Sequence, residues 1–167
     1  MNAWKLIKSL NKTQLKSLFF MFLRRPHYIY PTFRATSACY RICGKNFPGK
    51  HQLNGPENAF RHALWNILIA KATMKWIWIG NKAEKAGRWA EKITDWHEEF
   101  APNSDLAKAM DLHNNRIGRE LFLKWLNENK GLSNTFIVDE LKEMLPQSRK
   151  ITSVGDIEKQ TQHLIHL

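Results

Sequence analysis

The chain has 167 residues, which fits a single domain with a core of its own. Apolar residues make up 43% and charged residues 25%, as in ordinary globular proteins, and the apolar run LFFMFL at 18–23 is too short to span a bilayer as a helix. The net charge of +11 belongs to the N-terminal part, because the first 50 residues hold ten Lys or Arg and no Asp or Glu precedes Glu57.

This charge distribution suggests two parts. We expect a basic N-terminal helical segment at 1–50, packed on or appended to the rest, and a helical domain at 51–167 that carries the functional site. A basic segment of this kind would be drawn to anionic lipid or to nucleic acid.

Helical periodicity dominates along the chain and predicts an all-α fold, a single-domain bundle of six to seven helices. Pro26 ends the first helix, Pro56 suits the first turn of the third, and Asn81 caps the fourth. The expected helices cover 3–24, 33–44, 56–78, 82–100, 105–129 and 134–145. In the tail we expect a short strand at 149–154 and a final helix at 156–165.

The first expected helix, 3–24, leaves two interpretations open. Its lysines and the aromatic run suit a helix that lies in a membrane interface, as in a peripheral membrane protein, and they also suit a helix that packs on the core with a lysine-rich outer face. The run lacks a small-residue cleavage site, so a secretory signal peptide is not expected. Cytoplasmic residence and export by a specialised secretion system both stay open. Cys39 and Cys43, one turn apart, are expected to be buried free thiols.

Three short polar signatures interrupt the amphipathic helices: NAFRHALWN at 58–66, TDWHEE at 94–99 and MDLHNNRIGR at 110–119. A helix that only packs has no use for Arg-His, His-Glu or His-Asn-Asn in its middle. Imidazole and carboxylate groups gathered from several helices are what a metal site or an acid–base centre requires. The sequence therefore predicts a site built from three helices.

The first two signatures supply the candidate imidazoles. A positive charge at Arg61 disfavours the imidazolium form of His62, and neutral imidazole binds a metal or accepts a proton. His97 and Glu98 lie about 100° apart around their helix, so one can ligate while the other reaches a bound water.

The third signature places five residues on one helix face: Asp111, Asn114, Asn115, Gly118 and Arg119. Asparagine and glycine lower helix propensity, so something must offset their presence in mid-helix. Gly118 would permit close approach of another helix, while Asp111 and Asn115 could ligate a metal or orient a histidine. His113 projects from a different side and is the weakest candidate.

Together, the three signatures resemble those of a family of small, mostly uncharacterised bacterial helical domains. Its pattern is NAxRHAxWN, then a [TA]xxHE element, then MDLxNNxxGR, and related domains occur at the C-termini of large secreted polymorphic toxins. The resemblance covers about 54–120 and implies a functional site more strongly than any one reaction. It marks Asn58, Arg61, His62, Trp65, Asn66, His97, Glu98, Asp111, Asn114, Asn115, Gly118 and Arg119.

The leading hypothesis is a metal-dependent hydrolase. His62, His97 and Asp111 would hold a divalent ion such as zinc and leave an open position for water. Glu98 would act as general base on that water.

Arg61 and Arg119 would stabilise developing negative charge, with Asn115 as an orienting partner. Two arginines suit a phosphate-containing substrate, and with the basic N-terminal segment the first choice is a phospholipid or a lipid-linked cell-wall precursor. An antibacterial toxin or effector of this kind would have an immunity protein as partner. Nucleic acid comes second as a substrate or partner.

Two rivals remain. One is a metal-free hydrolase in which His and Glu act directly as acid and base. The other is a non-enzymatic membrane- or nucleic-acid-binding helical domain, whose polar cluster is a buried structural network. An HNH nuclease is not expected, because that site needs a ββα context and these signatures lie on long helices.

Overall fold

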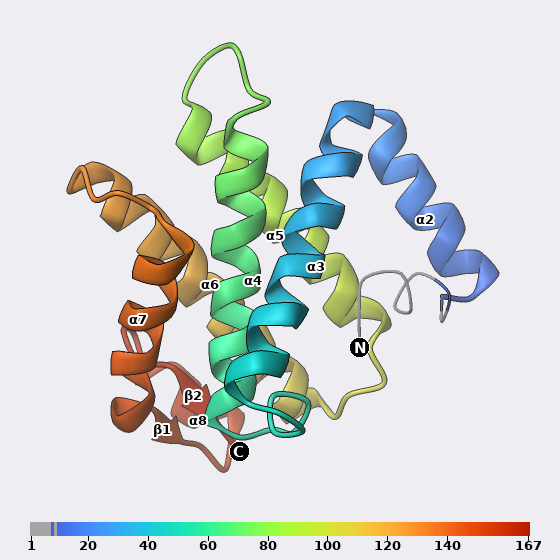
Figure 1. Ribbon diagram of the computed structural model, residues 1–167. Coiled ribbons are helices and arrows are strands. Elements are labelled where there is room, and N and C mark those ends of the chain that lie inside the picture. Colours follow the sequence, from blue (N-terminus) through green and yellow to red (C-terminus); the bar gives the residue numbers. More distant parts are fainter. Residues whose placement is uncertain (1–7, 9) are drawn as a thin grey trace.

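The computed structural model describes residue 8 and residues 10–167, and this part of the chain is a bundle of helices with one small sheet (Figure 1). Its seven α-helices are α2 (Lys12–Leu23), α3 (Ile29–Asn46), α4 (Pro56–Met74), α5 (Lys82–Phe100), α6 (Asp105–Asn127), α7 (Asn134–Met144) and α8 (Val154–Ile157). Two 3-10 turns, η1 (Pro26–Tyr28) and η2 (Leu145–Gln147), and two parallel strands, β1 (Arg149–Lys150) and β2 (Ile165–His166), complete it. The expected all-α, single-domain bundle of six to seven helices is confirmed.

The central helix is α4, which packs against α3, α5 and α6 (Figure 1). It is buried along most of its length, with Phe60, Leu64 and Ile67 among its fully buried side chains. A helix that is apolar on nearly all sides belongs in a core. The polar side chains that this helix does carry, His62 and Asn66 among them, are therefore buried and need hydrogen-bond partners.

Local signals place the starts of the helices that surround α4. The side chains of Asn81, Ser104 and Ser133 each accept a hydrogen bond from the backbone N–H three residues ahead, at the starts of α5, α6 and α7. Pro56 occupies the first turn of α4, where its missing N–H leaves no helical bond unmade. These signals fix where α4, α5 and α6, which carry the three signatures, begin.

Several expected boundaries were wrong. The α3 helix begins at Ile29 and not at 33, because Pro31 is tolerated in a first turn, and it continues past Gly44 to Asn46. The α4 helix ends at Met74 and not at 78, and a loop leads from there to α5.

The N-terminal part also differs from the single helix expected at 3–24. Residues 3–7 and 9 lie outside the described part of the chain. Leu10 and Asn11 are not helical, and Asn11 caps α2 in a reciprocal pair of hydrogen bonds with Gln14. None of the described helices has the length and apolar character needed to cross a bilayer.

The final helix expected at 156–165 was also wrong, since α8 ends at Ile157 and Ile165–His166 form β2. The strand expected at 149–154 shortens to the two residues of β1. The cause is a long-range contact: the Asn114 amide on α6 donates to the Ile165 carbonyl and accepts from the Ile165 N–H. This pairing holds the tail extended.

The hairpin of α2 and α3 shares the core of the rest of the protein. Met21, Tyr28 and Ala35 lie in the same cluster of buried side chains as the apolar residues of α4. Cys39 and Cys43 are buried free thiols, as predicted.

Candidate metal centre

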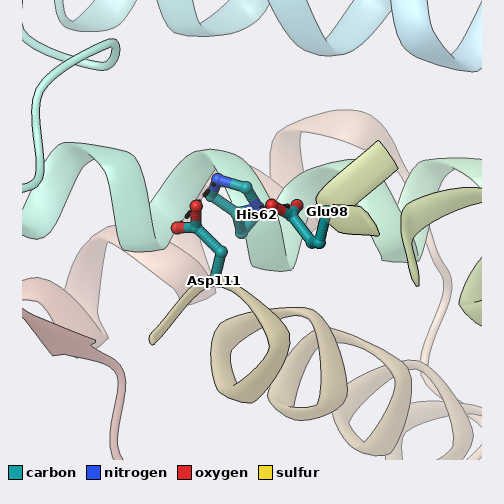
Figure 2. Close-up of side chains that lie close together, drawn as sticks. All are labelled: His62, Glu98 and Asp111. Atoms are coloured by element: carbon teal, nitrogen blue, oxygen red, sulfur yellow. Dashed lines mark ion pairs between the residues drawn. The ribbon is translucent and has the colours of Figure 1, made fainter. Parts of the chain in front are cut away.

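His62, Glu98 and Asp111 converge from three helices, and Figure 2 shows the imidazole between the two carboxyl groups. His62 Nδ1 lies 3.4 Å from Glu98 Oε1, and His62 Nε2 lies 3.1 Å from Asp111 Oδ1. All three side chains are almost fully buried. Each signature therefore contributes one residue to a single cluster: His62 comes from α4, Glu98 from the last turn of α5 and Asp111 from the second turn of α6.

Hydrogen bonding fixes the tautomer of His62. Arg61 Nη2 lies 2.7 Å from His62 Nε2, and because a guanidinium only donates, Nε2 must accept. The ring proton is then on Nδ1, where it faces Asn115 Oδ1 at 3.2 Å. The lone pair of His62 Nε2, near Asp111, is therefore the one that a metal ion would use, and the ion would take the place of Arg61 Nη2 there.

Acceptor atoms outnumber donors at this point. Among the described residues, Glu98 Oε2 and Asp111 Oδ1 are buried and have no hydrogen-bond partner. Buried acceptors without donors are destabilising, and either a proton on the carboxyl group or a bound cation satisfies them. One ligand atom from each of the three residues lies within 4.8 Å of the others, whereas the ligands of a tetrahedral ion lie about 3.5 Å apart. The cluster could hold a metal ion if its side chains move closer together.

The two carboxyl groups have strongly shifted acidities. Burial, reinforced by the nearby Asp111 carboxylate, raises the pKa of Glu98 to about 8. Burial also raises the pKa of Asp111 to about 7, against an opposing effect of Arg61. Glu98 lies near the C-terminus of its helix, where the helix dipole disfavours negative charge as well. A bound cation would reverse this preference and ionise both groups.

The pKa values of the two histidines are shifted in the opposite direction. Burial, together with the charge of Arg61, lowers the pKa of His62 well below its ordinary value. The same two causes lower the pKa of His97 to about 4. Both imidazoles are therefore neutral at pH 7, and for His62 this was expected from the position of Arg61.

Asn115 is the centre of a network behind the cluster. Its Oδ1 accepts from Asn66 Nδ2 at 2.7 Å, and its Nδ2 donates to Glu98 Oε1 at 3.4 Å. Asn66 Oδ1 in turn accepts from Thr94 Oγ1 and from Arg119 Nη1, both at 3.2 Å. The network holds one side of His62 and of Glu98 in place.

The two candidate arginines have different positions. Arg61 lines the cavity beside the cluster, and its Nε is buried without a partner among the described residues. Arg119 bonds Glu91 at 2.9 Å and Asn66 at 3.2 Å, and it reaches the cluster only through Asn66. Arg61 is therefore the arginine that a bound anion would meet.

His97 lies beside the cluster and outside the group of three. Its ring meets the Trp65 ring edge-on, with the centroids 5.1 Å apart. It lines the same cavity as Arg61 and the cluster residues. The structure therefore brings Glu98 to the position expected of His97, and it places His97 at the cavity wall.

The remaining residues of the third signature hold helices and tail together. A Cβ at Gly118 would lie 2.4 Å from the carbonyl oxygen of Ala63, so α4 and α6 touch here, as expected for this glycine. Asn114 binds the backbone of β2, and His113 Nε2 contacts the carbonyl oxygen of His163 at 2.9 Å. These two residues anchor the C-terminal tail.

Asn103 is a member of the site that the sequence analysis missed. Its Nδ2 donates to Asp111 Oδ2 at 3.2 Å, which orients this carboxyl group from the α5–α6 loop. Its position between Pro102 and the Ser104 cap is typical of a loop asparagine, so the sequence offers no signal for this role.

Two cavities adjoin each other at His97, beside the cluster. The first has a volume of about 310 Å³ and is lined by the cluster, Arg61 and His97, with the α5–α6 loop on one side. The second, of about 100 Å³, lies between α2, α3 and α5 and is mostly apolar. Leu10, Trp96 and His97 line both, so the polar cavity continues into an apolar slot.

The fold and the cluster together define an all-α protein with a buried histidine–carboxylate centre. A family model described as Domain of unknown function (DUF6973) matches residues 19–149, and the chain belongs to this family. The matched range includes all three signatures. No curated protein and no solved structure matches the chain.

Proposed function

We propose that this protein is a metal-dependent hydrolase that acts on a phosphate-containing substrate. One observation carries the proposal. A neutral His62, Glu98 and Asp111 converge with acceptor atoms that have no donor, beside a cavity lined by an arginine. One imidazole and two carboxyl groups suit a divalent ion such as zinc. An ion at this position would supply a Lewis acid and a water of lowered pKa.

The chain's own residues take distinct roles in this proposal. His62, Glu98 and Asp111 hold the ion, and Glu98 thus replaces His97 in the ligand set expected from the sequence. His97, neutral and on the cavity wall, accepts a proton from the attacking water. Arg61, which lines the cavity, binds the phosphate and stabilises the negative charge that develops there.

The adjoining slot favours an amphiphilic substrate, such as a phospholipid or a lipid-linked cell-wall precursor. Two of its polar groups already have partners, since the hydroxyls of Thr32 and Thr36 accept hydrogen bonds from Trp89 and Trp65, each at 2.9 Å. An apolar ligand in the slot would therefore contact few unpaired polar groups. The phosphate would lie in the polar cavity at Arg61 and an alkyl chain would extend along the slot.

The resemblance to toxin domains adds a biological role to the same proposal. As an antibacterial effector, the protein would damage membrane lipid or cell-wall precursors, and the producing cell would need an immunity protein. Expression directed to the bacterial cell envelope is expected to arrest growth for the wild type and not for Asp111→Asn.

Metal binding is the first test. We expect calorimetry and elemental analysis to find about one zinc or manganese ion per chain, and Asp111→Asn or Glu98→Gln to weaken binding by roughly 100-fold or more. Both substitutions keep side-chain shape, so the fold should persist. Glu99→Gln is the matched control, because Glu99 neighbours Glu98 but is exposed.

Activity is the second test. Release of phosphate or a phosphorylated headgroup from phospholipid and from a polyprenyl diphosphate is expected to require the ion and to fall strongly in Arg61→Gln. Activity that survives complete chelation would favour the metal-free hydrolase. A protein that binds no ion, and in which these variants lose only stability, would favour the structural network, for which the bonds of Asn115 and Asn66 are the supporting observation.

A further inference from the structure

One end of the molecule gathers apolar side chains in solvent. Of the twelve large hydrophobic side chains exposed in the described part of the chain, ten lie on α2, at the start of α3 or in the α4–α5 loop. Figure 1 shows the α2–α3 corner and this loop at the same end of the bundle. Trp78 is 74% exposed and Ile79 81%, and exposed apolar side chains that gather in one place indicate an interaction surface.

Ring contacts join the two segments into one surface. The rings of His27 and Trp78 have centroids 5.7 Å apart, and those of Tyr30 and Trp76 lie 6.4 Å apart. The α4–α5 loop therefore packs against the α2–α3 corner.

The outer face of α2 extends this surface. Leu15, Phe19, Phe20 and Leu23 follow the helical spacing i, i+4, i+5 and i+8, and all four are exposed. Met21 is buried on the opposite side. The second half of α2 thus turns apolar side chains outward, where a helix that only packs on a core would turn polar ones.

A basic pocket lies beside the apolar side chains. Its volume is about 530 Å³, and five basic residues line it: Arg24, Arg25, Lys85, Arg88 and Lys92. Glu84 pairs with Arg88, and the pocket lining itself contains no acidic residue. The pocket is therefore a net positive site suited to phosphate groups.

We propose that this surface docks the protein on a bilayer that contains anionic phospholipid. The docking face comprises Phe19, Phe20, Leu23, Tyr30, Trp78 and Ile79, with the basic pocket at its side. Aromatic and aliphatic side chains enter the interface between headgroups and acyl chains, while the basic residues bind lipid phosphates. The phosphates of a nucleic acid would also bind in the basic pocket, but Leu23 and Ile79 would then stay exposed to water.

Docking does not depend on the proposed hydrolase. The docking face lies at the end of α4 near Met74, whereas His62 is roughly 18 Å back along the helix, given 1.5 Å per residue. Membrane binding can therefore be measured with the metal centre inactive, for example in Asp111→Asn. If docking fails and hydrolysis persists, or the reverse, only one of the two proposals is lost.

Vesicle flotation tests the docking face. We expect the full chain to bind vesicles of phosphatidylcholine with phosphatidylglycerol, and to bind phosphatidylcholine alone at least tenfold more weakly. The double substitution Trp78→Ser with Ile79→Ser should reduce binding by tenfold or more, and each of Arg24→Gln and Arg25→Gln by roughly fivefold. These side chains are exposed, so far-ultraviolet circular dichroism should be unchanged.

Matched controls lie elsewhere on the surface. Leu53→Ser removes a side chain that is 63% exposed, and Lys159→Gln removes an exposed charge, and neither should change binding. Equal binding to neutral and anionic vesicles, or equal losses in the controls, would overturn the proposal. So would retention of vesicle binding by the Trp78 and Ile79 double variant. Binding to duplex DNA that survives this double variant, with no binding to vesicles, would assign the basic pocket to nucleic acid.

Discussion

At the scale of single residues, the metal centre depends on side chains that are held in their uncharged forms. Burial and Arg61 keep His62 neutral, and burial favours the protonated forms of Glu98 and Asp111. Neutral forms are the stable ones in a dry site, yet metal binding requires the two carboxyl groups to ionise. Ionising the two carboxyl groups offsets part of the free energy of metal binding. The residues that orient these groups therefore determine the net affinity.

Asn115 is expected to be the most important of these positioning residues. Asn115→Ala removes the acceptor for Asn66 and for His62 and the donor to Glu98. Loss of such an orienting partner lowers metal affinity by roughly 10- to 100-fold. Isothermal titration with zinc measures this, and an affinity equal to that of the wild type would contradict the role.

The neighbouring Asn114→Ala is the matched control. Asn114 binds Ile165 on β2 and, within the described part of the chain, does not bond to the cluster, so its loss should free the C-terminal tail. Faster hydrogen exchange at 163–167 with unchanged metal affinity is the expected result. The two adjacent asparagines would then separate an effect on the site from an effect on stability.

At the scale of elements, the sequence predicted the helices better than their arrangement. Capping residues such as Asn81 and Ser133 mark helix starts locally, so these starts were correct. The tail could not be predicted, because the strand at 165–166 depends on pairing with β1 and on contact with Asn114, 51 residues away. Local propensity carries no information about such a contact.

The candidate site shows the same limit. Signatures on three helices predicted that His62 and Asp111 would belong to one site. Helical geometry alone left open whether His97 or Glu98 faces them, since the two differ by about 100° around one helix. The choice depends on how α5 is rotated against α4, which is set by the packing of its whole buried face.

Gly118 sets the separation between α4 and α6, and with it the distance from His62 to Asp111. In Gly118→Ala, the new Cβ would meet the backbone of Ala63 at 2.4 Å, which the helix cannot accommodate without moving. We expect a loss of about 3 kcal/mol in the free energy of unfolding, together with weaker metal binding. Urea denaturation and zinc titration measure the two effects.

Gly87→Ala is the control for Gly118, since it is also a buried helical glycine but has open space around its Cβ position. Alanine there should raise the free energy of unfolding by up to about 1 kcal/mol through its higher helix propensity. Similar losses in both variants would show that close approach at Gly118 is not the cause.

At the scale of the whole molecule, the opposing shifts of carboxyl groups and histidines predict how stability depends on pH. A carboxyl group whose pKa is raised by folding keeps a proton that the unfolded chain releases, so rising pH favours unfolding up to the folded pKa. This applies to Asp111 up to about pH 7 and to Glu98 up to about pH 8. His62 and His97 have lowered pKa values and act in the opposite direction.

The histidines act only below about pH 6.5, because above this value the imidazole is neutral in the folded and in the unfolded chain. Below pH 6.5, the effects of the two carboxyl groups and of the two histidines on the free energy of unfolding largely offset one another. Above pH 6.5, only the carboxyl groups change this free energy. The free energy of unfolding of the metal-free protein should therefore fall by roughly 2 kcal/mol between about pH 6.5 and 8.

Urea denaturation across this range in a chelating buffer measures the decline. Glu98→Gln should remove the larger part of it, because a glutamine has no proton to lose, whereas the exposed control Glu99→Gln should leave it intact. Excess zinc should abolish the decline in the wild type, since the ion replaces both protons and stabilises the ionised carboxylates. A decline that persists in Glu98→Gln, or that zinc does not affect, would mean that this cluster does not control the stability of the protein above pH 6.5.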